Sequence, residues 1–177
     1  MLSIRQLGAR LSQSLFARQK SLAHHRQRRP LTLEAIEPRM LLSASALLDT
    51  ASGVLSVSGD GANDVIAVEQ IDFTSDGSVT LQLTLNGLGD DSLKFAGVKE
   101  LAIDAGGGSD QIHLLSEITV DASIVGGTGD DTIFAPDVDT DWLLNGAGSG
   151  VVADIDYSGI ERLVGGSAVD LFSVTGT

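Results

Sequence analysis

Short runs of alternating apolar and polar residues dominate the chain from about residue 47 onward. In the clearest run, residues 79–86 (VTLQLTLN), every second residue is apolar. A period of two is that of a half-buried β-strand. Gly, Asp, Asn and Ser separate nearly all of the runs, as turns require. The pattern therefore predicts an all-β domain with strands at residues 54–57, 64–68, 79–86, 93–95, 101–103, 111–115, 118–120, 132–134, 142–144, 151–155, 162–164 and 171–174.

The first 46 residues follow a different pattern. Apolar residues recur at positions 4, 7, 11 and 15 with basic residues between them, which indicates a short amphipathic helix or a disordered basic arm. An apolar run follows at residues 40–48, and residues 44–46 (ASA) have the small-x-small form of an export cleavage site. We interpret residues 1–46 as a basic export leader. No run is long and apolar enough to predict a membrane-spanning helix.

Four glycine- and aspartate-rich turns recur along the β region. Residues 126–134 (GGTGDDTIF) fill every place of the pattern G-G-x-G-x-D-x-U-x, in which U is a large apolar residue. Weaker copies stand at residues 105–113, 165–172 and 59–66. Their key aspartates, at positions 64, 110, 131 and 170, lie 46, 21 and 39 residues apart. These intervals are close to two, one and two turns of a coil of about 20 residues, and they predict a solenoid.

The complete copy resembles the calcium-binding nonapeptide repeats of bacterial secreted proteins. The resemblance implies a parallel β-helix or β-roll with calcium (Ca2+) between stacked turns. One coil would join residues 101–104 to 111–115, the next 118–125 to 132–134, and a third, longer coil would run from 142 to 170. In the family the nonapeptides follow one another directly, whereas no copy here is immediately followed by another.

The residue types of these turns suit calcium. Asp carboxylates and backbone carbonyls are hard oxygen ligands, of which the ion takes about six to eight. Asp110 and Asp131 lie one coil apart, so they would share an ion with the carbonyls of the glycine turns, and Asp170 would extend the row. The alternative is that these aspartates only cap their own turns. The candidate metal-site residues are Asp64, Gly106, Gly108, Asp110, Gly127, Gly129, Asp130, Asp131 and Asp170.

A second resemblance covers residues 31–44. The residues EPRMLL at positions 37–42, with Ile36 in the leading place, are similar to the Leu-Glu-Pro-Arg-x-Leu-Leu (LEPR-XLL) domain at the start of large bacterial secreted or surface proteins. Residues 141–146 and 157–166 resemble a spacer between nonapeptide turns in adhesin-like proteins. These resemblances imply export and a long repetitive body. The alternative for residues 31–44 is a helix broken by Pro38.

Charge is divided unevenly along the chain. Residues 1–40 hold eight basic and two acidic residues, whereas residues 41–177 hold three basic and 22 acidic ones, so the net charges are +6 and −19. Nucleic acid is a poor partner for so acidic a body. Cysteine is absent, so disulfides do not contribute to stability.

The sequence predicts no enzyme. His24 and His25 stand in the basic arm and His113 stands alone, so no two histidines are placed to share zinc or to form an acid/base pair. The acidic pairs at residues 90–91 and 130–131 and the series 137, 139 and 141 keep open a polysaccharide-binding or polysaccharide-cleaving β-helix. A two-sheet sandwich at residues 47–100 is a further alternative.

Together these observations predict three parts: a basic leader (1–46), an irregular β region with the first coils (47–100) and β-helical repeats with Gly/Asp turns (101–177). The expected function is that of a non-catalytic structural or adhesive module, secreted or on the cell surface and stabilised by calcium. Its expected partners are components of the cell envelope or the extracellular matrix. The uncapped last strand indicates part of a longer protein.

Overall fold

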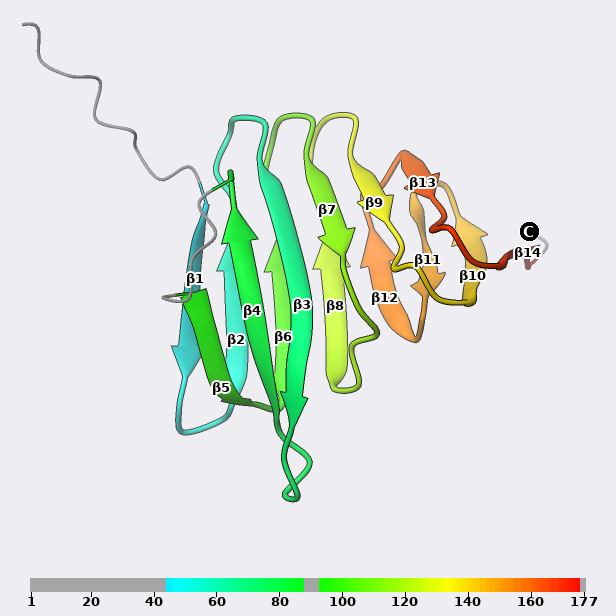
Figure 1. Cartoon of the computed structure of the whole chain (residues 1–177). Helices are drawn as coiled ribbons and strands as arrows, with labels where there is room; N and C mark the ends of the chain where they lie inside the picture. Colours follow the sequence, from blue (N-terminus) through cyan, green and yellow to red (C-terminus); the bar gives the residue numbers. More distant parts are fainter. Residues whose placement is uncertain (1–43, 88–92, 176–177) are drawn as a thin grey trace, which may run out of the picture. The chain divides into compact units, whose positions relative to one another are not determined.

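The computed structural model describes residues 44–87 and 93–175 (Figure 1). These residues are almost entirely β-strand and turn, so the predicted all-β class is confirmed. The predicted leader helix and the segment at residues 31–42 lie outside the described residues. The described strands are β1 (Ser45–Asp49), β2 (Val54–Ser58), β3 (Val65–Phe73), β4 (Val79–Leu85), β5 (Lys94–Val98), β6 (Glu100–Asp104), β7 (Gln111–Leu114), β8 (Asp121–Val125), β9 (Thr132–Phe134), β10 (Thr140–Gly146), β11 (Ser149–Val152), β12 (Ile155–Ser158), β13 (Arg162–Val164) and β14 (Asp170–Val174).

The strands form two mixed sheets. The order in the first is β1-β2-β6-β8-β12-β11-β10-β14, and in the second β13-β9-β7-β3-β4-β5. Within them, β2, β6, β8 and β12 are parallel neighbours, as are β3, β7, β9 and β13. Each strand of the first set leads through one turn into a strand of the second, and three of these turns stand side by side in Figure 1. The chain therefore passes repeatedly from one sheet to the other.

A single apolar core lies between the two sheets. The alternation of β4 is confirmed, since Val79, Leu81, Leu83 and Leu85 are buried and the residues between them are only half-buried. Equivalent positions of successive strands stack, as Ile66, Ile112 and Ile133 do in the second sheet. Repeating the same aliphatic residue at the same register lets each layer pack on the next with little change of shape.

Antiparallel segments flank the parallel strands. At one end β1 pairs with β2, and β3, β4 and β5 form a meander. Towards the other end β10, β11 and β12 form a second meander, and β14 lies parallel to β10 at the edge of the sheet. The long third coil predicted for residues 142–170 is thus interrupted by this meander, although β14 does return parallel to β10, with Asp170 beside Thr140.

Two strand predictions are also wrong. Residues 118–120 form a loop that precedes β8, although the loop residue Ile118 is buried in the core. Residues 151–155 are interrupted by a turn at Ala153 and Asp154, both of which have positive φ, and β12 begins only after it. The predicted leader (1–46) ends too late, because Ser45 and Ala46 already belong to strand β1.

Candidate functional site

The turns that join the two sheets stack backbone against backbone. A Cβ added at Gly127 would overlap the carbonyl oxygen of Gly106, and one at Gly106 would overlap the carbonyl oxygen of Asp60. Gly107 and Thr128 form a parallel bridge between two of these turns. The glycines of the pattern are thus required by the close approach of neighbouring turns as well as by positive φ.

A row of acidic side chains connects the turns. The N–H of Asp64 donates to Oδ1 of Asp110 at 2.7 Å, and the N–H of Asp110 donates to Oδ1 of Asp131 at 2.8 Å. The N–H of Asp131 in turn donates to Oε2 of Glu161 at 2.8 Å. We call these four residues the acidic ladder. Each rung ties a strand-start amide to a carboxylate of the next turn, so it links segments that are distant in sequence.

The carboxylates of the ladder differ in their surroundings. Asp64, Asp110 and Asp131 are at most 1% exposed, whereas Glu161 at the end of the row is exposed. The second carboxylate oxygen of Asp64 accepts the N–H of Asp60 at 3.0 Å. The Oδ2 atoms of Asp110 and Asp131 are buried without any hydrogen-bond partner. These two oxygens are the anomaly of the site, because a buried polar atom without a partner costs free energy.

Burial and neighbouring negative charge act on the same two carboxyls. Desolvation raises the pKa of Asp110, and the charges of Asp131, Asp64 and Asp60 raise it further, although the hydrogen bond from the Asp64 N–H acts against them. Desolvation likewise raises the pKa of Asp131, with Glu161 and Asp130 adding to the effect. Ionised, this pair is a destabilising element that a proton or a cation would relieve.

Asp64 has an additional partner at the other end of the row. The side-chain amide of Asn86 donates to Oδ1 of Asp64 at 2.8 Å, and Oδ1 of Asn86 accepts the N–H of Val65 at 2.7 Å. Asn86 has a φ of 52°, and it follows strand β4. It therefore closes the first turn of the stack with a neutral side chain.

The structure brings together only some of the predicted site residues. Asp64, Asp110 and Asp131 share the ladder, with Gly106, Gly108, Gly127 and Gly129 in the turns beside them. Asp130 is exposed on the outside of its turn. Asp170 lies at the start of β14, where its Oδ1 accepts the indole N–H of Trp142 at 3.3 Å. It does not extend the row beyond Asp131.

Glu161 takes the position expected of Asp170, and sequence reasoning missed it. Its turn lacks the glycine pattern, so no nonapeptide copy marks it. Only the register of β13 with β9 in the structure, in which Arg162 is paired with Thr132, reveals it. This pairing places residue 161 beside Asp131, the residue just before Thr132.

Calcium fits this site in part. The unpartnered Oδ2 atoms of Asp110 and Asp131 are hard oxygen ligands in adjacent turns. The carbonyls of Gly106 and Thr128, however, already accept backbone N–H groups. Among the described residues no three His, Cys, Asp or Glu side chains are grouped so as to hold a metal. An ion at this place would depend on the two aspartates together with turn carbonyls.

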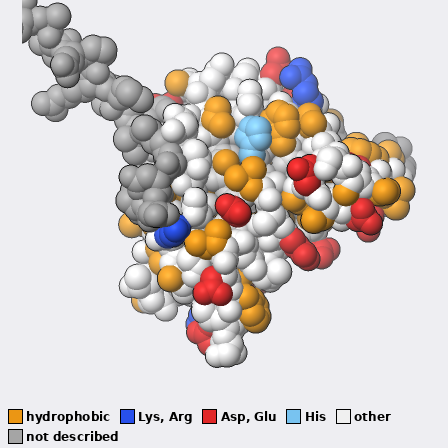
Figure 2. Space-filling view, in the orientation of Figure 1, with side chains coloured by type: hydrophobic (Ala, Val, Ile, Leu, Met, Phe, Trp, Pro, Cys, Tyr) orange, Lys and Arg blue, Asp and Glu red, His pale blue; other side chains and the backbone are white. Residues whose placement is uncertain are grey.

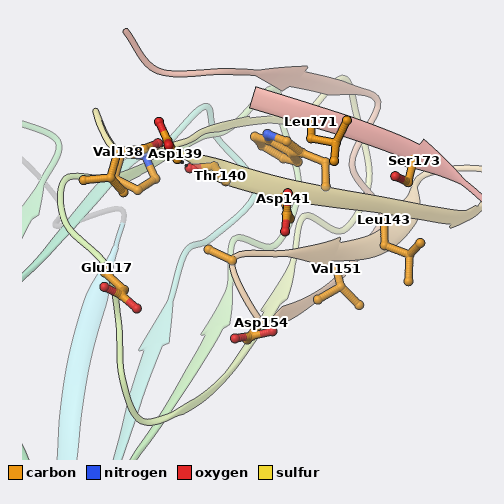
Figure 3. Close-up of a pocket in the computed structure, with 13 residues that line it drawn as sticks. Glu117, Val138, Asp139, Thr140, Asp141, Leu143, Val151, Asp154, Leu171 and Ser173 are labelled. Carbon is orange, nitrogen blue, oxygen red and sulfur yellow. Dashed lines mark hydrogen bonds between the residues drawn. The ribbon is translucent and has the colours of Figure 1, made fainter. Parts of the chain in front are cut away.

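A separate open cavity of about 760 Å³ lies where β10, β11 and β14 meet the loop before β8 (Figure 3). Asp141 of β10 and Asp154 of the β11–β12 turn both line it, with Glu117 on the opposite side. Trp142 is 1% exposed, so its ring is not available to stack on a sugar. Histidine is absent from the lining, and the cavity is an acidic surface groove rather than an enclosed active site.

The outer face of the second sheet carries the remaining distinctive side chains. His113 of β7 stacks on Phe134 of β9 with ring centroids 4.2 Å apart and planes 1° apart. Figure 2 shows the histidine surrounded by apolar side chains. Burial lowers the pKa of His113, which keeps the ring neutral at physiological pH. It is a packed side chain, and its Nε2 lies 3.4 Å from the side-chain oxygen Oε1 of Gln111.

The search for membrane-spanning helices and the comparisons with known proteins give no further indication of function. Within residues 44–87 and 93–175 there is no helix with the length and hydrophobicity needed to cross a bilayer. No protein-family model, curated protein or solved structure matches the chain. The interpretation of its function therefore depends on the geometry of the turns and the ladder.

Proposed function

We propose that this chain carries a non-catalytic structural module of a secreted or surface protein, built as a short parallel β-solenoid. The acidic ladder supports the proposal most directly, because its bonds join turns 21 to 46 residues apart in sequence. Side chains that hold stacked coils together are what an extended spacer needs. The module would space or present adhesive parts of a larger protein towards the cell envelope or the extracellular matrix.

The turn glycines support the solenoid interpretation. Gly127 and Gly129 approach the backbone of the preceding turn at Gly106 and Gly108 so closely that neither leaves room for a side chain. The two apolar rows of β6 with β8 and of β7 with β9 continue this stacking into the core. Turn, ladder and core repeat with the same register, which supports the proposed solenoid.

Calcium is part of the proposal as a stabilising ligand of the Asp110 and Asp131 pair. A divalent ion would neutralise two buried carboxylates whose Oδ2 atoms have no partner. Extracellular calcium modules bind with dissociation constants of roughly 10⁻⁴ to 10⁻³ M, so about 1 mM calcium would add up to about 1.4 kcal/mol for one site. Because both oxygens are inaccessible to solvent, the turns have to open slightly to admit the ion.

Thermal unfolding of the full chain tests the calcium part, with about 1 mM calcium and then with a chelator. We expect a melting temperature that is several degrees higher with calcium, and no calcium effect in the Asp110→Asn/Asp131→Asn double variant. The Asp104→Asn/Asp121→Asn variant makes the same change in charge at two exposed strand ends and should keep the calcium effect. Identical melting with and without calcium would remove calcium from the proposal and leave the structural module standing.

The groove of Figure 3 favours one alternative, a polysaccharide-binding or polysaccharide-cleaving domain. Its carboxylates Asp141 and Asp154 both face an open cavity, as a glycan site requires. Incubation with acidic and neutral polysaccharides, followed by measurement of new reducing ends, tests this alternative. Turnover that disappears in Asp141→Asn would replace the structural proposal with an enzymatic one.

A further inference from the structure

Asparagine is followed directly by glycine at two places in the chain, Asn86–Gly87 and Asn145–Gly146. In such a pair the backbone nitrogen of the glycine can attack the side-chain carbonyl carbon (Cγ) of the asparagine, because glycine has no Cβ to hinder the approach. The two groups must first reach attacking distance, so the reaction depends on how freely the asparagine side chain can rotate. The structure places the two pairs in very different surroundings.

The side chain of Asn86 is held at both of its polar atoms. Its Nδ2 donates to Oδ1 of Asp64 at 2.8 Å, and its Oδ1 accepts the N–H of Val65 at 2.7 Å. The backbone N–H of Asn86 also donates to the carbonyl of Val65 at 2.8 Å. Asp64 is buried, so the amide is bonded to a carboxylate that is shielded from water. Rotation of Cγ towards the nitrogen of Gly87 would break the two side-chain bonds.

The surroundings of Asn145 restrain it much less. It lies near the end of β10, in the hairpin to β11, where both Asn145 and Gly146 are exposed. Its Oδ1 accepts the hydroxyl of Ser149 at 3.1 Å, which is a contact between two side chains of the same hairpin. The pairing of β10 with β11 also shifts register between Leu144 and Gly146, so the ladder is already interrupted at this residue. The side chain of Asn145 can therefore rotate without breaking a buried contact.

We propose that Asn145 is a site of spontaneous deamidation in the folded protein and that Asn86 is protected from the same reaction. The nitrogen of Gly146 gives up its proton and attacks Cγ of Asn145, and the new C–N bond closes a succinimide ring. The bond from Cγ to Nδ2 breaks, and the amino group leaves as ammonia with that proton. Water then opens the ring at either carbonyl and leaves an aspartate or an isoaspartate at position 145.

The fold accommodates the product at only one of the two places. An isoaspartate lengthens the backbone by a methylene group between residues 145 and 146, where the register of the hairpin is already shifted. A carboxylate at position 86 would instead face the carboxylate of Asp64 and be repelled by it. Deamidation at Asn145 thus adds a negative charge to an exposed hairpin while the two sheets stay intact.

Peptide mapping by mass spectrometry, on the full chain incubated in mildly alkaline buffer, is the measurement. The peptide with Asn145 should gain the mass difference between OH and NH2. It should do so at least about tenfold faster than the peptide with Asn86, because a hydrogen bond to a charged group must first open at Asn86. In urea the contacts of Asn86 are lost, so the two rates should become similar.

Two variants of the hairpin test the chemistry. Gly146→Ala places a Cβ beside the attacking nitrogen and should remove most of the mass gain at Asn145. Its Cβ would approach the hydroxyl of Ser149, a side chain that can rotate away, and circular dichroism verifies that the variant is folded. Ala147→Ser changes the same exposed hairpin but keeps the Asn145–Gly146 pair, so its mass gain should match that of the wild type.

Three results would each overturn the proposal. The first is an Asn145 peptide that keeps its mass in the folded protein. The second is a Gly146→Ala variant that reacts as fast as the wild type. The third is a ratio of the Asn145 and Asn86 rates that is the same with and without urea, because the fold would then have no part in the difference.

Discussion

The backbone N–H of Asp64 donates a 2.7 Å hydrogen bond to the carboxylate of Asp110, a residue 46 positions later in the chain. The bond is buried, and it repeats between Asp110 and Asp131. Asp110 and Asp131 therefore each act twice, as a backbone donor to one neighbour in the ladder and as a side-chain acceptor for the other. The consequences of this double role can be measured.

The first prediction concerns one rung of the ladder. Asp110→Ala leaves the N–H of Asp64 buried without its acceptor, which should lower the free energy of unfolding by about 1–3 kcal/mol. The matched control is Asp104→Ala, which removes an exposed aspartate from the neighbouring strand and should change stability by less than about 0.5 kcal/mol. Urea denaturation of the full chain gives both values. Equal losses in the two variants would mean that the rung contributes nothing.

The second prediction concerns pH in calcium-free buffer. Raised pKa values mean that folded Asp110 and Asp131 bind protons more tightly than the unfolded chain does. Their contribution to the free energy of unfolding is fully present below the unfolded pKa of about 3.9. It is lost as pH rises through the folded pKa. The free energy of unfolding should therefore fall as pH increases across this window.

Asp49 and Asp76 affect the free energy of unfolding in a separate, more acidic pH range. Hydrogen bonds from Ala51 and Ser52 lower the pKa of Asp49, and those from Thr74 and Ser78 lower the pKa of Asp76. Stability from these groups is lost only as pH falls below their unfolded values. The double variant Asp110→Asn/Asp131→Asn should lose the fall in stability that these two carboxyls cause above about pH 4, and it should keep the acid limb. The opposite contribution of His113 remains in both proteins. An unchanged slope in that variant would show that other groups are responsible.

A third prediction separates two costs of adding a methyl group to a turn. Gly126→Ala would place its Cβ against the carbonyl oxygen of Gly159, so it should lower the free energy of unfolding by about 3 kcal/mol or more. Gly77 has a φ of 84° and open space around it, so Gly77→Ala should cost only the strain of about 1–2 kcal/mol. Gly61→Ala has neither obstacle and should be neutral or slightly stabilising. The order of the three midpoints in urea is the test; a Gly126 variant as stable as the Gly61 variant would refute close stacking of the turns.

The fourth prediction concerns His113. Burial lowers the pKa of its ring, so folding disfavours the protonated form. Stability should be lost as pH falls below about 6.5, the unfolded value, and this loss should be absent in His113→Gln. NMR titration of the ring protons should give a midpoint below about 6.5. A midpoint at or above the value of a free peptide would contradict the packed, neutral ring described above.

The sequence predicted two of the turns that form the site, but it did not predict which residue ends the acidic ladder. The glycine and aspartate pattern at residues 105–110 and 126–131 predicts two adjacent turns, and β6 and β8 do lie side by side in parallel. Asp170 was expected in the same row because 39 residues is close to two coils of about 20. The meander of β10, β11 and β12 uses up that length within one sheet, so the row continues at Glu161 instead.

The sequence by itself determined the all-β class, most strand positions and the turn glycines, because a period of two and the demand for positive φ are local properties of the chain. Only the tertiary structure decided which carboxylate meets which amide, and that Oδ2 of Asp110 and Oδ2 of Asp131 are buried without partners. Register and burial depend on how segments distant in sequence are placed beside one another, and no local pattern encodes that placement.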